Sequence, residues 1–278
     1  MAEQPLKKRL EKLRGIIISF RKAIVAYSGG VDSSFLLKCC LDYLGKDNVL
    51  AVTAVSPTYT RKELTTAKEI AKGLRVSHAI ISTEEVDNPN FRSNPRNRCY
   101  YCKTELFSRL KSIAQKKGIG FVLDGTNADD LKDYRPGRQA KEELGVRSPL
   151  AESGLRKADI RQLSRKFGLK TWDAPQAACL ASRFAYGQEI APEDLGRIEK
   201  AEDYLRSLGI KMARVRHYVL ADKTRLARIE VDREEIQIVT SHKLQAARRL
   251  KKLGYNYVTL DLEGYRTGSM NEGITDIV

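Results

Sequence analysis

The sequence predicts an α/β protein with a doubly wound parallel sheet, followed by a smaller α+β domain. Two observations predict this fold class. Short apolar runs alternate with helix-length stretches through the first part of the chain, which is the pattern of parallel βαβ units. From about residue 189 the order changes to a helix, two strands, a long helix and a last strand. We therefore expect one domain over residues 1–187 and a second over residues 188–278.

The elements follow from the spacing of apolar residues. In the first domain we expect strands at 23–27, 49–55, 76–81 and 121–124, and helices at 5–19, 33–44, 61–74, 103–117 and 156–167. Residues 87–98 hold two Asn-Pro pairs and are interpreted as a loop, whereas residues 172–187 show no clear period. In the second domain we expect a helix at 192–208, strands at 212–218 and 225–231, a long helix at 232–253 and a strand at 255–261. We expect the second sheet to be antiparallel.

The composition favours a cytoplasmic protein with polyanionic partners. The 278 residues include 50 Lys and Arg against 35 Asp and Glu, a formal charge of +15. This charge suits nucleic acids, nucleotides or other phosphorylated molecules, although a basic surface can also serve solubility alone. No apolar run reaches the roughly 18 residues of a membrane span, so we expect no membrane partner. The five cysteines are an odd number, which argues for metal-binding or catalytic thiols over a disulfide framework.

Residues 28–34, Ser-Gly-Gly-Val-Asp-Ser-Ser, link the first predicted strand to the next helix. Glycines let the backbone approach an anion, and the N-terminus of the helix adds positive potential. The loop lacks the lysine of a Walker A motif, and alone it could be a plain turn. It resembles the SGGxDS loop of PP-loop ATP pyrophosphatases, which split ATP into AMP and pyrophosphate while adenylating a substrate. The predicted ATP ligands here are Ser28, Gly29, Gly30, Asp32, Ser33 and Ser34.

Residues 124–130, Asp-Gly-Thr-Asn-Ala-Asp-Asp, follow another predicted strand. Parallel strands end at the same sheet edge, so this stretch is expected beside the first loop. It resembles the GTNxDD element of the same superfamily, although an Asn/Asp turn before a helix would look alike. We expect Gly125, Thr126 and Asn127 to bind ATP. Asp32 and Asp129 are the predicted catalytic carboxylates, and with Asp130 they are candidates for holding Mg²⁺.

Three cysteines form a candidate metal site. Cys99 and Cys102 make a C-x-x-C motif, and Cys179 lies far downstream. Three thiolates suit a [4Fe–4S] cluster with one open iron, whereas structural zinc ordinarily takes four protein ligands, and no histidine is near in sequence. Cys39 and Cys40 lie among leucines of a predicted helix and are expected in the core.

Longer blocks extend the resemblance to nearly the whole chain. The stretches NPRNRCYYCKTELF, DGTNADDLKDYRPGRQA, RSPLAESGLRKADIRQLS, ACLASRFAYGQEI, RLARIEV and GYRTGS resemble the LarE-type sulfur transferases, which make the nickel-pincer nucleotide cofactor of lactate racemase. The resemblance implies that ATP adenylates a carboxylate of pyridinium-3,5-biscarboxylic acid mononucleotide and that sulfur then replaces the activated oxygen. It also implies that Cys179 stands where the family keeps its sacrificial sulfur source.

The two further cysteines depart from the single-cysteine pattern. Cys99 and Cys102 suggest the branch in which a [4Fe–4S] cluster, held with Cys179, carries an exogenous sulfide. The sacrificial role of Cys179 stays open as the alternative. We expect a homo-oligomer and no stable nucleic-acid partner.

Basic residues near the second domain suit a phosphorylated substrate. Arg214 and Arg216 alternate on a predicted strand and therefore share a face, and Arg183 follows Cys179 by four residues. Guanidinium groups match phosphate oxygens in pairs. The resemblance places the phosphate of the mononucleotide near these three arginines, with Glu202 close by. The alternative is that they are strand charges facing water.

Other functions stay open at this stage. A PP-loop tRNA thiolase can also combine the same loop, three cysteines and positive charge. A non-catalytic ATP-binding or iron–sulfur storage protein would not need the carboxylates, and an amidating enzyme like NAD or GMP synthetase would not need three thiols.

Overall fold

The computed structural model describes residues 3–131, 136–175, 178–266 and 268–271. The chain forms two compact units: Met1–Asn88 with Asn97–Ala177, and Pro89–Arg96 with Ala178–Val278. A short segment from the first half of the sequence, Pro89–Arg96, thus belongs to the second unit. These units are defined by contacts within the chain and not by independent folding. The predicted boundary between two folding domains, after residue 187, stays a prediction.

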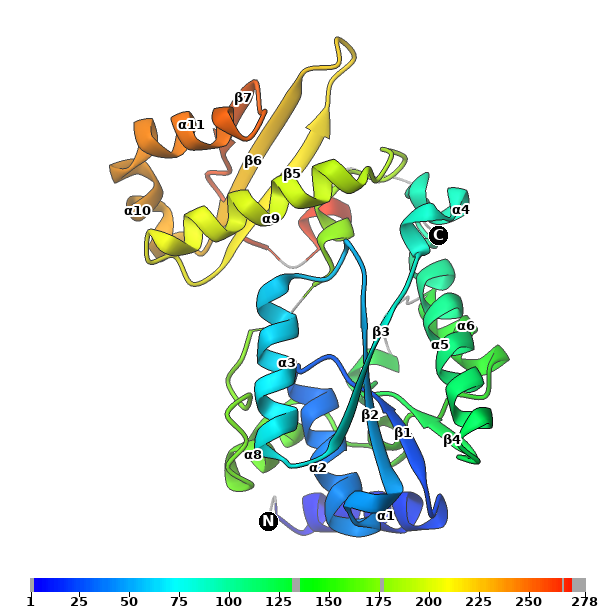
Figure 1. The fold of residues 1–278 in the computed structure, drawn as a ribbon. Coiled ribbons are helices and arrows are strands. Elements are labelled where there is room, and N and C mark those ends of the chain that lie inside the picture. Colours follow the sequence, from blue (N-terminus) through cyan, green and yellow to red (C-terminus); the bar gives the residue numbers. More distant parts are fainter. Residues whose placement is uncertain (1–2, 132–135, 176–177, 267, 272–278) are drawn as a thin grey trace. The chain divides into compact units, whose positions relative to one another are not determined.

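The first unit is built on a four-stranded sheet in the order β3-β2-β1-β4, with all strands parallel (Figure 1). Its strands are β1 (Ala23–Ala26), β2 (Val49–Val55), β3 (Ser77–Ser82) and β4 (Phe121–Leu123). The two central strands are apolar on both faces, since Val25 and Ala51 belong to one core cluster and Ile24 and Val52 to another. The predicted fold class is confirmed.

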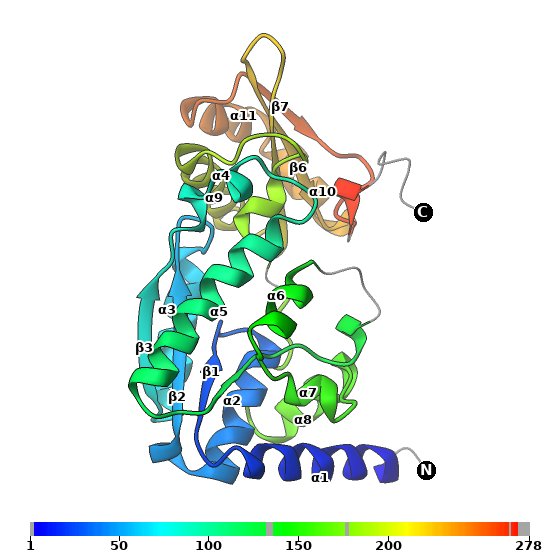
Figure 2. The same ribbon diagram turned by 90° about the vertical axis from the view of Figure 1, so that its right-hand side faces the viewer.

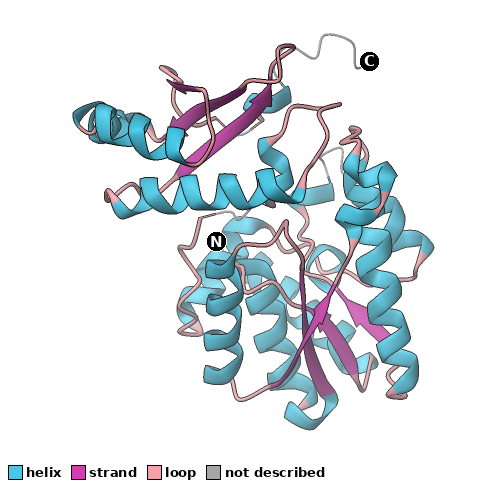
Figure 3. Ribbon diagram, turned by 45° about the horizontal axis from the view of Figure 1, so that its top comes forward, coloured by secondary structure: helices cyan, strands magenta, loops and turns pink. Residues whose placement is uncertain are grey.

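Helices cover both faces of this sheet (Figures 2 and 3). The first core cluster joins the sheet to α1 (Glu3–Ser19), α2 (Val31–Leu44), α3 (Arg61–Gly73) and α8 (Lys157–Lys166). The second cluster joins the other face to α5 (Arg98–Lys116), against which α6 (Gly137–Glu143) packs. The short helix α7 (Pro149–Glu152) precedes α8. No helix in the described parts of either unit is long and apolar enough to cross a membrane.

The second unit holds a three-stranded sheet in the order β5-β6-β7. The strands are β5 (Ala213–Val219), β6 (Arg225–Val231) and β7 (Tyr257–Leu260), and α9 (Pro192–Ser207), α10 (Ile236–Ser241) and α11 (Lys243–Lys252) pack on one face. The expectation of an antiparallel sheet is wrong in part. β5 and β6 are antiparallel, but β7 runs parallel to β6, because α10 and α11 carry the chain back to the starting end of the sheet.

Three other expectations need correction. Helix α5 begins at Arg98, five residues before the predicted start, so the C-x-x-C motif lies in a helix and not in a loop. The predicted loop 87–98 contains the short helix α4 (Pro89–Arg92). The long helix expected at 232–253 is divided near His242, after a run of β-branched residues that favour helices weakly.

Candidate active site

The Ser-Gly-Gly loop lies between β1 and α2, as predicted. Gly30 is the N-cap of α2 and no side chain caps the helix, so the first turn presents its N–H groups at the loop. Gly29 has a φ of +74°, and a Cβ built there would lie 2.9 Å from the backbone of Ala67. Only glycine therefore fits at position 29. These features make the loop a candidate anion site.

Serines hold this loop in shape. The hydroxyl oxygens of Ser28 and Ser33 lie 3.0 Å apart, and the Ser33 hydroxyl accepts the Ser28 N–H at 3.2 Å. Ser34 is fully buried. Tyr59, which the sequence reasoning did not single out, donates its hydroxyl hydrogen to the Ser28 carbonyl at 2.7 Å. The loop is thus braced from the segment that follows β2.

Asp32 is partly buried and pairs with Lys157. The Lys157 Nζ lies 2.5 Å from Asp32 Oδ2, with side-chain exposures of 31% and 22%. Burial raises the pKa of Asp32 above its ordinary value, and Lys157 lowers it by a smaller amount. The Lys157 backbone N–H also donates to Asp129 Oδ2 at 2.9 Å. One lysine therefore contacts both predicted catalytic carboxylates.

Lys157 was missed by the sequence reasoning. It is the first residue of α8, where a positive side chain opposes the helix dipole. A lysine at such a position needs a local anionic partner, and this could have served as the signal.

The second predicted loop lies beside the first. A Cβ at Gly125 would come within 2.9 Å of the Ser33 backbone nitrogen, so the two loops touch through their backbones. Asn127 is buried, and its side-chain oxygen accepts the Asp129 N–H at 2.9 Å. Both stretches therefore meet at the carboxyl edge of the sheet, as expected.

A buried lysine, Lys141, stabilises the second loop, residues 124–130. Lys141 Nζ donates to Thr126 Oγ1 at 2.6 Å and lies 3.1 Å from Asp124 Oδ2. Asp124 also accepts the Thr126 and Ser148 hydroxyls at 2.7 and 2.5 Å. Because Lys141 comes from α6, the sequence offered no local sign of this support.

The C-x-x-C thiols lie on one helical face. Cys99 and Cys102 are three residues apart at the start of α5; Cys99 is exposed and Cys102 is half-buried. Among the described residues, no group of three or more His, Cys, Asp and Glu side chains is assembled to hold a metal ion. Cys179 belongs to the second unit, so a shared cluster with Cys99 and Cys102 stays a prediction.

Cys179 is exposed and directly precedes the 3-10 turn η4 (Leu180–Arg183). Arg183 ends this turn with an exposure of only 2%, and its Nε and Nη2 donate to the two carboxylate oxygens of Glu202 at 2.8 and 3.0 Å. Its Nη1 donates to the carbonyls of Ala178 and Cys179 at 2.6 and 3.1 Å. Burial by itself raises the pKa of Glu202, but Arg183, Arg214 and the Val215 N–H together outweigh it, so the pKa lies below its ordinary value.

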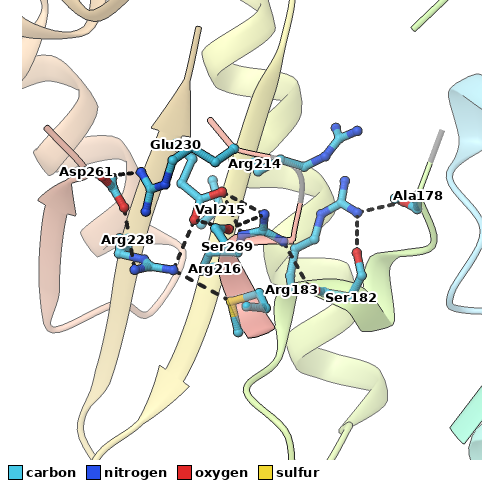
Figure 4. Close-up of polar contacts among 12 residues, drawn as sticks. Ala178, Ser182, Arg183, Arg214, Val215, Arg216, Arg228, Glu230, Asp261 and Ser269 are labelled. Atoms are coloured by element: carbon cyan, nitrogen blue, oxygen red, sulfur yellow. Dashed lines mark hydrogen bonds and ion pairs between the residues drawn. The ribbon is translucent and has the colours of Figure 1, made fainter. Parts of the chain in front are cut away.

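Arg214 and Arg216 share the sheet face opposite the helices of the second unit (Figure 4). Both are buried, so they are not strand charges facing water. Arg216 Nε and Nη2 donate to Glu230 Oε2 at 2.9 and 2.6 Å, and its Nη1 donates to the Ser182 carbonyl at 3.0 Å. Ser269 from the C-terminal segment joins the same network.

Positive charge is concentrated around Arg214. Its guanidinium lies 5.8 Å from the ring centroid of Tyr265. Burial, together with the charges of Arg183 and Arg216, lowers the pKa of Arg214 below its ordinary value, against the opposing effect of Glu202. An anion bound here would reduce this repulsion.

Comparison with known proteins decides the family. The NAD synthase family model matches residues 6–116. The chain is 46% identical to an uncharacterized protein of Synechocystis sp., over 97% of this chain and 99% of that protein. It is 38% identical to the pyridinium-3,5-bisthiocarboxylic acid mononucleotide synthase of Lactiplantibacillus plantarum, over 92% of this chain and 91% of the synthase. The chain belongs to the LarE family.

Membership of the LarE family confirms the predicted relationship, and with it an ATP-dependent enzyme of the PP-loop type. The NAD synthase match covers the part of the chain that carries the Ser-Gly-Gly loop. An uncharacterized protein of Methanocaldococcus jannaschii is also similar, with 32% identity over 89% of this chain and 92% of its own length. The roles of single residues stay predictions.

Proposed function

We propose that this LarE-family enzyme uses ATP to adenylate a carboxylate of pyridinium-3,5-biscarboxylic acid mononucleotide and then replaces the activated oxygen with sulfur. The carboxylate oxygen attacks the α-phosphorus of ATP and pyrophosphate leaves; the sulfur nucleophile then attacks the carboxyl carbon and AMP leaves. The near-full-length identity to a synthase of the bisthiocarboxylic acid mononucleotide carries the proposal.

The residues at the sheet edge suit the first step. Backbone N–H groups of the 28–34 loop and the α2 N-terminus would bind the phosphates, and Asp32 with Asp129 would hold Mg²⁺, which binds ATP with few protein carboxylates. In this structure the Lys157 ammonium forms an ion pair with the Asp32 carboxylate. We propose that Lys157 moves from Asp32 to a phosphate oxygen when Mg²⁺·ATP arrives. It would then supply the charge that a Walker lysine supplies elsewhere.

The arginine face of the second unit suits the other end of the substrate. Arg214 and Arg216 would anchor the mononucleotide phosphate, because buried guanidinium groups form strong charge-assisted hydrogen bonds with phosphate oxygens. The pKa of Arg214 is lowered first by burial and then by the charges of Arg183 and Arg216, and a bound anion would offset both effects.

The sulfur donor divides the proposal into two routes. We favour a [4Fe–4S] cluster held by Cys99, Cys102 and Cys179, which when bound would supply an iron that takes up hydrosulfide. Three soft thiolates, two of them on one helical turn, are a suitable donor set. In the alternative route the Cys179 thiolate attacks the activated carboxyl carbon. Loss of the Cys179 α-proton then breaks its Cβ–S bond, leaving a thiocarboxylate and dehydroalanine.

Anaerobic incubation with the pyridinium mononucleotide, ATP and Mg²⁺ tests the function. We expect AMP, pyrophosphate and a product in which sulfur replaces oxygen, detected by mass spectrometry. ADP and phosphate as products, or selective binding of tRNA at physiological salt, would contradict it. Iron and sulfide analysis of the same sample, with the mass of the Cys179 peptide after turnover, decides between the two routes.

A further inference from the structure

Two buried arginines donate hydrogen bonds to the backbone of residues 178–183, here called the Cys179 loop (Figure 4). Arg183 donates to the carbonyls of Ala178 and Cys179, at the start of the loop. Arg216 donates to the carbonyl of Ser182, near its end. The cysteine side chain is exposed, while the backbone that carries it is fixed to buried charges.

Both arginines connect the Cys179 loop to β5, the strand that carries the predicted phosphate ligands Arg214 and Arg216. Arg183 is paired with Glu202, whose Oε1 also accepts the backbone N–H of Val215 at 3.1 Å. Val215 lies on β5 between Arg214 and Arg216. Arg216 reaches the loop directly from that strand. Two routes of hydrogen bonds therefore connect the Cys179 loop to the arginine face.

We propose that Arg183, through its ion pair with Glu202, is a positioning residue for Cys179, and that phosphate bound at the arginine face changes how the Cys179 thiol is presented. This rests on the proposed function, in which Cys179 handles sulfur and the arginine face binds the mononucleotide phosphate. Arg183 then acts behind the phosphate ligands, because its side chain is only 2% exposed and its nitrogens donate to Glu202 and to the Cys179 loop. On Arg216, by contrast, phosphate would take the place of Glu230 or Ser269.

The chemistry gives this coupling a purpose. An activated acyl group is hydrolysed if the sulfur nucleophile is misplaced, and small errors in position slow a reaction strongly. A loop that responds to the substrate's phosphate would present Cys179 only when the mononucleotide is in place. Buried ion pairs suit this role because they fix geometry, although their desolvation cost makes them weak sources of stability.

The test measures alkylation of Cys179 by iodoacetamide, with inorganic phosphate as the probe. Wild-type protein is compared with Arg183→Lys, and with Arg225→Lys as a matched control. Arg225 also pairs with a buried carboxylate of the same unit, that of Asp194, but within the described residues it forms no hydrogen bond or ion pair with the Cys179 loop. Peptide mass spectrometry follows Cys179, with Cys99 and Cys102 as internal references, and thermal unfolding checks each fold.

In the wild type and in Arg225→Lys, saturating phosphate should change the Cys179 alkylation rate by about fivefold or more, the lower range of coupling between linked sites. Arg183→Lys should still bind phosphate in calorimetry but lose this dependence. If Arg183→Lys does not fold, Glu202→Gln serves instead, since it weakens the same pair with little change of shape. A wild-type rate that ignores phosphate, or a folded variant with unchanged dependence, would overturn the inference.

These outcomes are separable from those of the proposed function. The alkylation test contains no ATP and no pyridinium compound. Product formation without phosphate-dependent alkylation would refute only the coupling, whereas phosphate-dependent alkylation without product formation would refute only the proposed reaction.

Discussion

The two predicted anion sites of this enzyme are built in opposite ways. The predicted ATP loop, residues 28–34 of the first unit, offers backbone N–H groups, glycine and hydroxyls, and the ion pair of its Asp32 with Lys157 is partly exposed. The arginine face of the second unit uses guanidinium–carboxylate pairs whose members are almost fully buried. Backbone donors bind phosphate without burying a net charge, whereas each buried arginine requires a carboxylate to offset its desolvation.

The two sites should also tolerate different substitutions. A backbone site is sensitive to chain conformation and insensitive to most side chains, whereas a charged cluster is sensitive to the loss of any one partner. Variants of the two units test this difference, from the largest expected effect to the smallest.

Arg216→Ala should lower the free energy of unfolding by about 3–5 kcal/mol, because it leaves Glu230, which has no exposed surface, without its close partner. Chemical denaturation measures the change. Arg228→Ala is the matched control. Arg228 contacts the same carboxylate at 3.0 Å but is 28% exposed, so its loss should lower the free energy of unfolding much less. Equal costs for the two variants would show that burial does not set the energetics of this cluster.

The buried polar interior of the second unit should also be sensitive to acid. Burial, Arg197 and Arg225 lower the pKa of His217 from 6.5 to about 4. The unfolded chain therefore takes up a proton as the pH falls below 6.5, while the folded chain does so only near pH 4. His217 should thus remove up to about 3 kcal/mol of stability between pH 6.5 and 4.

Denaturation of His217→Gln across this pH range should show a weaker loss of stability than the wild type. His78 in the first unit is the control. The pKa of His78 is also lowered by burial, but the ring is only half-buried, so His78→Gln should change the pH dependence less. A wild-type pH profile in His217→Gln would contradict the prediction.

Two neighbouring glycines test the backbone site. Gly29→Ala should reduce pyrophosphate release by roughly 5- to 150-fold, as expected from about 1–3 kcal/mol of strain at a positive φ with a backbone clash. Gly30→Ala should be nearly silent, because Gly30 has a φ of −76° and its Cβ would meet only the flexible Ser28 hydroxyl, at 3.4 Å. A large loss of pyrophosphate release in Gly30→Ala would mean that the ATP phosphates approach the Gly30 backbone too closely for a Cβ to fit between them.

Lys157→Met should weaken ATP binding by about tenfold. The effect is the smallest of the four because Lys157 must first give up Asp32 before it can reach a phosphate. Calorimetry with a non-hydrolysable ATP analogue measures the affinity, and Lys157→Arg, which keeps the charge, should recover most of it. Tighter ATP binding in Lys157→Met would instead show that the lysine only blocks Asp32.

Local sequence was sufficient where one short segment determines the result. Strands Val49–Val55 and Arg225–Val231 lie where the apolar pattern predicts them, and the fold class is confirmed. The two predicted ATP-binding stretches, residues 28–34 and 124–130, lie at the sheet edge as expected because each is a run of consecutive residues after a strand. The start of α5 was missed because residues 98–102 contain no strong helix signal, and the α6 residue Gly137 packs against this first turn at Cys99 and Lys103.

Contacts between distant residues could not be predicted. Lys157 meets Asp32 across 125 residues, and the Arg183 pair with Glu202 depends on how η4 lies against α9. The arginines were predicted as phosphate ligands from the family resemblance and, for Arg214 and Arg216, from their alternation. Glu202 was expected nearby, but nothing in the sequence indicated that Glu230 pairs with Arg216. The parallel pairing of β7 with β6, by contrast, could have been predicted, because a helical crossover joins the two strands.

The segment Pro89–Arg96 has a consequence for how the protein is made. Phe91 and Asn94 are buried in the second unit, where the Asn94 side-chain amide donates to the Ala185 carbonyl at 2.6 Å and the Arg92 carbonyl accepts the Ile190 N–H at 2.8 Å. At about 5–20 residues per second, the ribosome needs several seconds to deliver these partners after the segment has emerged. During that time the part of the first unit that precedes Ala177 emerges beside a segment whose hydrogen-bond partners have not yet been made. A gene split between codons 177 and 178 would place Pro89–Arg96 on one product and the rest of its unit, with the Ala185 carbonyl that Asn94 contacts, on the other.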